Sequence, residues 1–106
     1  SLSLLKDALK GIYIQSYKEY HIVIVDNGSN HNEIQKLVGF AKDNNIDIVI
    51  NKKNLGFAKG NNVGIKYLNN KYNCNAYFIV NSDTYISDCH FLEKCVDEME
   101  VVLEYK

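Results

Sequence analysis

The sequence predicts an α/β domain in which helices cover both faces of a small parallel sheet. Short, continuous apolar runs alternate with longer segments of helical periodicity, as in parallel sheets whose strands are joined by helices. Two of the apolar runs end in an aspartate and a turn. We therefore expect a three-layer sandwich whose strands cover residues 20–26, 46–51 and 75–81.

A helix is predicted over residues 3–16, because Leu5, Leu9 and Ile12 recur on one face. Gly11 lies inside this segment and weakens the helix by roughly 1 kcal/mol relative to alanine.

The next strand, residues 20–26, is rich in valine and isoleucine without polar alternation, which indicates a strand covered on both faces. Asn-Gly at 27–28 then predicts a turn. Asn30 with Glu33 resembles a capping box, so a helix is expected over residues 31–44.

A short strand over residues 46–51 is followed by a predicted loop at 52–57 and a helix over 58–70. After the strand at 75–81, Ser87 or Asp88 is expected to cap a last helix, residues 89–105.

Composition limits the classes of protein that the chain can represent. Of its 106 residues, 46% are hydrophobic and 24% are charged, which predicts a packed core. The net charge of −1 does not favour nucleic acid as a partner. The apolar runs are far shorter than the roughly 20 residues that span a bilayer. The three cysteines lack the spacing of metal ligands, which is typical of a reduced, cytoplasmic chain.

The chain has no initiator methionine and begins with a helix where a right-handed βαβ unit needs a preceding strand. We therefore expect residues 1–106 to be a single partial domain from a longer protein. Sheet edges left without a neighbour would favour self-association.

Four motifs follow one another in the sequence. They are Gln15-Ser16-Tyr17, Val25-Asp26-Asn27-Gly28-Ser29, Asn54-Leu55-Gly56-Phe57-Ala58-Lys59-Gly60-Asn61-Asn62-Val63-Gly64 and Asn81-Ser82-Asp83-Thr84. Together they resemble the nucleotide-sugar-binding half of family 2 inverting glycosyltransferases, which have the A-type fold, a Rossmann-like arrangement. The chain is most similar to the branch that includes rhamnosyltransferases and other cell-surface polysaccharide enzymes.

The resemblance implies roles for the two aspartates that end apolar runs. Asp26 would accept a hydrogen bond from the nucleotide base; alternatively, it caps its own turn. Asp83 would bind Mg²⁺ or Mn²⁺ that bridges the diphosphate, with Asn81 orienting a ribose or a metal-bound water. Alternatively, Asp83 begins a turn with Thr84.

The resemblance also implies that the glycine-rich loop faces the ligand. Lys59 would offer its charge to a phosphate and Asn62 a hydrogen bond, whereas Gly64 is expected to be small for packing of the helix on the sheet. The implied nucleotide-binding set is Asp26, Asn27, Asn54, Gly56, Lys59, Asn62 and Asn81, with Asp83 as the metal ligand. No catalytic residue is expected in this chain, because the base that deprotonates the acceptor lies in the later half of such enzymes.

The implied reaction is metal-dependent transfer of a sugar, with inversion, from a UDP- or dTDP-linked donor to a saccharide or lipid-linked acceptor. The parent protein would be cytoplasmic or at the inner face of the membrane, and the isolated fragment inactive. The alternative is a non-catalytic nucleotide-binding or assembly module. A receiver domain and a dinucleotide-binding oxidoreductase are disfavoured, because an acidic pair near the first strand and the Gly-x-Gly-x-x-Gly fingerprint are not seen.

Overall fold

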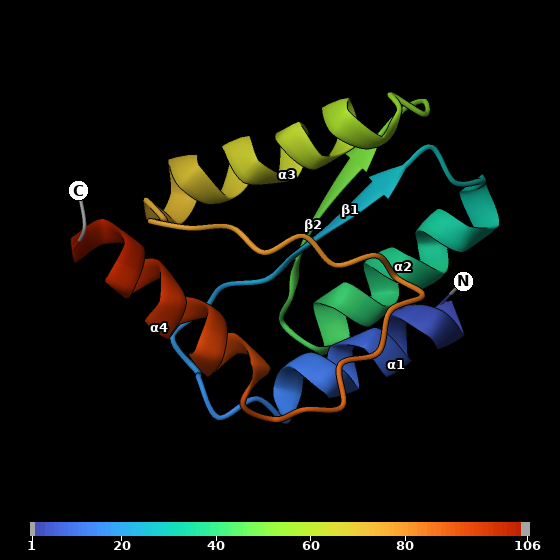
Figure 1. Ribbon diagram of the computed structural model, residues 1–106. Helices are drawn as coiled ribbons and strands as arrows, with labels where there is room; N and C mark the ends of the chain where they lie inside the picture. Colours follow the sequence, from blue (N-terminus) through green and yellow to red (C-terminus); the bar gives the residue numbers. More distant parts are fainter. Residues whose placement is uncertain (1, 105–106) are drawn as a thin grey trace. The chain divides into compact units, whose positions relative to one another are not determined.

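The computed structural model describes the backbone of residues 2–104 and the side chains of residues 2–99. The elements in chain order are α1 (Leu2–Tyr13), β1 (Val23–Asn27), α2 (His31–Asp43), β2 (Asp47–Asn51), α3 (Phe57–Tyr72) and α4 (Phe91–Glu104) (Figure 1). The predicted α/β class is confirmed. The chain forms two compact units, which we call the sheet unit (His21–Ile79) and the helical unit (Ser3–Tyr20 with the chain from Val80 onward).

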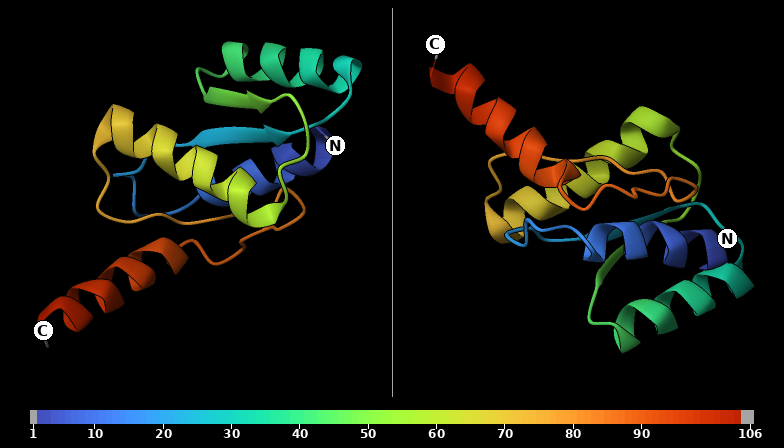
Figure 2. Two further views of the ribbon diagram at one scale, coloured as in Figure 1. Left: turned by 90° about the horizontal axis from the view of Figure 1, so that it is seen from above. Right: turned by 60° about the horizontal axis from the view of Figure 1, so that its bottom comes forward.

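The sheet unit is built on the parallel pair β1 and β2, in which Val23 lies opposite Asp47 and Asn27 opposite Asn51. Helix α2 connects these strands and lies next to β2 (Figure 2). It begins as predicted, because the Asn30 side chain accepts a hydrogen bond of 2.9 Å from the Glu33 N–H.

Helix α3 covers one face of β1, and α2 lies on the other side of the strand pair (Figure 1). A Cβ atom on Gly64 would lie 2.8 Å from Cγ2 of Val25, so this glycine lets α3 approach the strand closely. The expectation that Gly64 is small for packing is thus confirmed. Side chains alternate along a strand, so Ile24 and Asp26 point to the opposite face, where both are buried.

The prediction of a third strand at residues 75–81 is wrong. The described chain has a sheet of two strands, and this segment is irregular, with 50% of Phe78 and 51% of Ile79 exposed. A strand forms only where its backbone groups pair with a neighbouring strand. An apolar composition therefore shows that a segment could form a strand. It does not show that another strand is available to pair with it.

Several predicted boundaries also shift. Helix α1 ends at Tyr13, the strand begins at Val23 and α4 begins at Phe91. The predicted end of the last helix at residue 105 lies outside the described residues.

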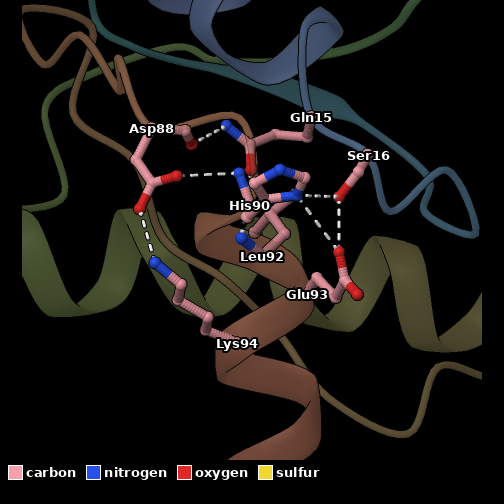
Figure 3. Close-up of polar contacts among 7 residues, drawn as sticks. All are labelled: Gln15, Ser16, Asp88, His90, Leu92, Glu93 and Lys94. Atoms are coloured by element: carbon pink, nitrogen blue, oxygen red, sulfur yellow. Dashed lines mark hydrogen bonds and ion pairs between the residues drawn. The ribbon is translucent and has the colours of Figure 1, made fainter.

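In the helical unit, the fully buried side chain of Gln15 joins the end of α1 to the start of α4. Its amide donates to the Gly11 carbonyl at 2.9 Å. It also donates to the Asp88 carbonyl (2.8 Å), and its oxygen accepts from the Leu92 N–H at 3.0 Å (Figure 3). Gly11 is required here, since a Cβ atom on it would lie 2.7 Å from the Ile86 carbonyl oxygen.

At the amino-terminal end of β2, the Asp47 carboxylate accepts hydrogen bonds from Lys71 (2.8 Å) and from the Tyr72 hydroxyl (3.1 Å). His21 stacks on the Tyr72 ring with 3.6 Å between ring centroids. The hydrogen bond from Lys71 holds the pKa of Asp47 below its ordinary value, and Asp47 in turn raises the pKa of Lys71.

We predict opposite effects for the same substitution at two helical glycines. Gly11→Ala should lower the free energy of unfolding by about 1–2 kcal/mol, because overpacking against backbone atoms outweighs the gain in helix propensity. Gly39→Ala should raise it by up to about 1 kcal/mol, since nothing lies within 4 Å of a Cβ atom there. Urea unfolding measures both, and equal shifts for the two variants would contradict the close contact at Gly11.

We also predict a pH dependence for the pair formed by Asp47 and Lys71. Because the pKa of Asp47 is lowered on folding, its stabilising effect is complete above the pKa of the unfolded chain and is lost as the pH falls through the folded value. Asp47→Asn should therefore reduce the free energy of unfolding at pH 7 and have a smaller effect at pH 3. Urea titrations at both pH values measure this, and a difference that is constant with pH would refute it.

Candidate functional site

The side chain of Asn27, the last residue of β1, lies at the centre of a group of amides. Its oxygen accepts hydrogen bonds from the Leu55 N–H (3.0 Å) and from Nδ2 of Asn51 (3.3 Å). Its nitrogen donates to Oδ1 of Asn54 (3.1 Å) and to the Gly56 carbonyl (3.2 Å). We call Asn27, Asn51 and Asn54 the asparagine cluster. A primary amide offers two donors and two acceptor positions, and Asn27 uses all four.

The segment between β2 and α3 passes directly over Gly28. A Cβ atom on Gly28 would lie 2.5 Å from the Asn54 nitrogen, and the residue has φ +91°. Asn54 closes the next turn, because its Oδ1 also accepts from the Gly56 N–H at 2.7 Å. The turn at Asn27-Gly28 and the start of the glycine-rich loop at Asn54 are therefore in contact.

Helix α3 begins beside the same amide. Gly56 precedes the helix with φ +85°, and a Cβ atom on Gly60 would lie 3.0 Å from Nδ2 of Asn27. The first N–H groups of a helix have no acceptor within it, and they favour anions. Two predicted site residues, Lys59 and Asn62, are exposed on the first two turns of α3.

Asp26 is 4% exposed, and its Oδ2 accepts a hydrogen bond of 3.1 Å from the Ser29 N–H. The turn-capping alternative for Asp26 is therefore present. Within the described chain this is the only hydrogen bond of the carboxylate, and no buried side-chain oxygen there lacks a partner. Oδ1 of Asp26 thus has no hydrogen bond to a described residue.

Asn81 and Asp83 lie in the helical unit. The Asn81 carbonyl accepts from the Thr84 N–H at 3.0 Å, so a turn begins at Asn81 and has Asp83 in its middle, rather than beginning at Asp83 as the alternative had it. Asp83 is exposed and has no hydrogen bond or ion pair with the residues described. Parallel strands that ended at both aspartates would bring Asp83 close to Asp26 at one sheet edge, and this nearness stays a prediction, because Asp26 belongs to the sheet unit.

A second polar group in the helical unit joins Ser16, His90 and Glu93. The Ser16 hydroxyl donates to Oε2 of Glu93 at 2.7 Å, and Nδ1 of His90 lies 3.1 Å from that hydroxyl (Figure 3). Nδ1 also lies 3.3 Å from Oε2 of Glu93. A nucleophilic triad uses opposite ring nitrogens for serine and carboxylate, so this group is not one. The Ser16 hydroxyl and then His90 hold the pKa of Glu93 below its ordinary value.

Sequence reasoning missed the part that Asn51 plays. The sequence held a signal for this role. Asn27 follows the predicted strand at 20–26, and Asn51 ends the predicted strand at 46–51. In the parallel register, Asn27 and Asn51 are directly opposite each other at the carboxyl ends of β1 and β2, where open α/β sheets bind ligands.

We predict that Gly28 tolerates alanine less well than Gly56. Both have positive φ, which costs other residues roughly 1–3 kcal/mol, but only Gly28 is also in contact with backbone atoms. Gly28→Ala should therefore lower the free energy of unfolding more than Gly56→Ala, as measured by urea unfolding. Equal losses would show that the segment over Gly28 moves away freely.

Comparison with known protein families gives a match, which covers nearly the whole chain. Residues 2–101 match the model of Glycosyl transferase family 2. No curated protein and no solved structure gave a match. None of the described helices combines the length and the apolar character needed to cross a membrane. The match covers both compact units and all four motifs, and the chain therefore belongs to glycosyl transferase family 2.

Proposed function

We propose that this chain binds the nucleotide of a nucleotide-diphosphate sugar, UDP- or dTDP-linked, within a protein that transfers the sugar with inversion. Family membership supports glycosyl transfer in general. The asparagine cluster carries the more specific proposal, because it brings Asn54, Gly56 and the start of α3 to the strand end that also bears Asp26. The acceptor would be a saccharide or a lipid-linked saccharide.

Asp26 would accept a hydrogen bond from the base of the nucleotide. Its Oδ1 is an acceptor without a hydrogen bond to a described residue, on a carboxylate that the Ser29 N–H holds in place. An imide N–H of uracil or thymine requires such a fixed acceptor. We therefore expect a pyrimidine nucleotide with an imide to bind better than other nucleotides.

The phosphates would lie near the start of α3. The free N–H groups of the first turn, together with the exposed cation of Lys59, favour an anion there. Asn62 and Asn54 are exposed and would add hydrogen bonds. In the other unit, Asn81 would orient the ribose or a metal-bound water.

Asp83 would be a ligand of Mg²⁺ or Mn²⁺. The described residues contain no group of three or more metal-binding side chains, but these cations often take one or two carboxylates and fill their remaining positions with phosphates and water. A single exposed carboxylate fits that pattern. The bound cation would neutralise charge on the departing diphosphate.

The remaining predictions concern the longer protein. We propose that it acts in the cytoplasm or at the inner face of the membrane in the synthesis of cell-surface polysaccharide, in the rhamnosyltransferase-like branch. We expect the isolated chain to be inactive and to self-associate through the edges of its two-stranded sheet.

Calorimetry with UDP, dTDP and GDP, each with MnCl₂, tests the proposal. We expect saturable binding of UDP or dTDP, weaker binding of GDP, and at least tenfold weaker binding to Asp83→Ala and to Asp26→Asn. Asp97→Ala, which removes another exposed carboxylate of the helical unit, is the control and should bind normally. A folded chain that binds none of these nucleotides would instead support a purely structural role for Asp26 and Asp83.

A further inference from the structure

We propose that Asn27 is a positioning residue, which holds residues 51–56 and the first turn of α3 in the shape that the nucleotide requires and does not itself contact the nucleotide. The sequence indicated a direct contact for Asn27. The inference rests on the proposed function for the identity of the ligand, whereas the holding role rests on the hydrogen bonds alone.

The first argument is that the Asn27 amide has no free position. Both of its N–H groups and both acceptor positions of its oxygen are used at 3.0–3.3 Å. A nucleotide could bind this amide only by replacing one of those partners. Asp26, by comparison, retains one oxygen without a hydrogen bond.

The second argument is that the four partners come from different parts of the chain. Asn51 ends β2, Asn54 and Leu55 belong to the connecting segment, and Gly56 precedes α3. One side chain thus ties the ends of both strands to the start of the helix. The connecting segment is irregular and its residues 52–54 are exposed, so few other contacts determine its shape.

The third argument is that glycines let α3 and the connecting segment come close to the half-buried amide. Cβ atoms on Gly60 would approach Nδ2 and Cγ of Asn27 to 3.0 and 3.2 Å, and Gly28 lies under the backbone of Asn54. The amide is therefore held between α3 and the connecting segment. A ligand near the first turn of α3 would bind to a surface whose shape depends on this packing.

The partners also explain why the residue is an amide. Asn27→Asp would place a carboxylate oxygen against two acceptors, Oδ1 of Asn54 and the Gly56 carbonyl. Both hydrogen bonds would be lost and replaced by repulsion. The same exchange at a residue that merely faced solvent would leave the connecting segment unchanged.

Hydrogen exchange of the free protein tests the holding role. In Asn27→Ala, exchange of the Leu55 amide should accelerate at least tenfold, because that N–H donates to Asn27, and trypsin should cleave after Lys52 or Lys53 faster. Asp47→Asn removes polar contacts at the opposite end of the same strands and should leave Leu55 unchanged. Unchanged exchange in Asn27→Ala would overturn the proposal.

Nucleotide affinity tests the positioning role. Asn27→Ala should weaken UDP–Mn²⁺ binding at least tenfold, and Asp47→Asn less than twofold. Adding Gly39→Ala to Asn27→Ala should recover stability without recovering affinity, which separates positioning from general destabilisation. Should Asn27→Ala fail to fold, Asn51→Ala removes one donor to the same amide and should show smaller changes in both measurements.

The possible results are distinguishable. Faster exchange with weaker binding supports the proposal. Weaker binding with unchanged exchange would indicate direct contact with the nucleotide, and faster exchange with unchanged binding would show that the segment does not serve the ligand; either overturns it. A wild-type chain that binds no nucleotide refutes the proposed function and the nucleotide part of this inference, whereas the exchange data still decide the holding role.

Discussion

The hydrogen bonds of the Asn27 side chain determine how β1, β2 and α3 meet in the sheet unit. A half-buried polar side chain is stabilising when its donors and acceptors are paired, and Asn27 pairs all of them with partners from separate segments. The carboxyl end of a two-stranded sheet is otherwise poorly defined, because so small a sheet is marginal on its own. The asparagine cluster fixes the ends of β1 and β2 relative to the start of α3.

Glycines make this arrangement possible by removing side chains where backbones approach. Gly28 lies under the connecting segment, Gly60 beside the Asn27 amide and Gly64 against Val25. Gly11 serves the helical unit in the same way. The glycine-rich motif of this family thus has a packing function in this chain, besides any approach to a ligand. The contrast is Gly39, which has open space around its Cα atom.

Both aspartates take part in a turn and keep a carboxylate oxygen without a hydrogen bond to a described residue. Asp26 gives one oxygen to the Ser29 N–H, which orients the carboxylate and leaves the other oxygen open. Asp83 stands in a turn closed by the Asn81 carbonyl and the Thr84 N–H, with its carboxylate exposed. Such a turn positions the carboxylate and leaves its oxygens without hydrogen bonds within the described chain. A hard cation binds to oxygen atoms of this kind.

Residue patterns alone were enough to predict the α/β class, the four helices of the described residues, the strands that became β1 and β2, and the cap at Asn30. These features follow from periodicity and from contacts between near neighbours in the chain. The folded chain was needed to show that residues 75–81 stay outside the sheet and that Asn27 pairs with Asn51. It alone also showed why Gly11 is required. Strand pairing, side-chain register and close approach depend on residues distant in sequence, and local patterns carry no information about where those residues lie.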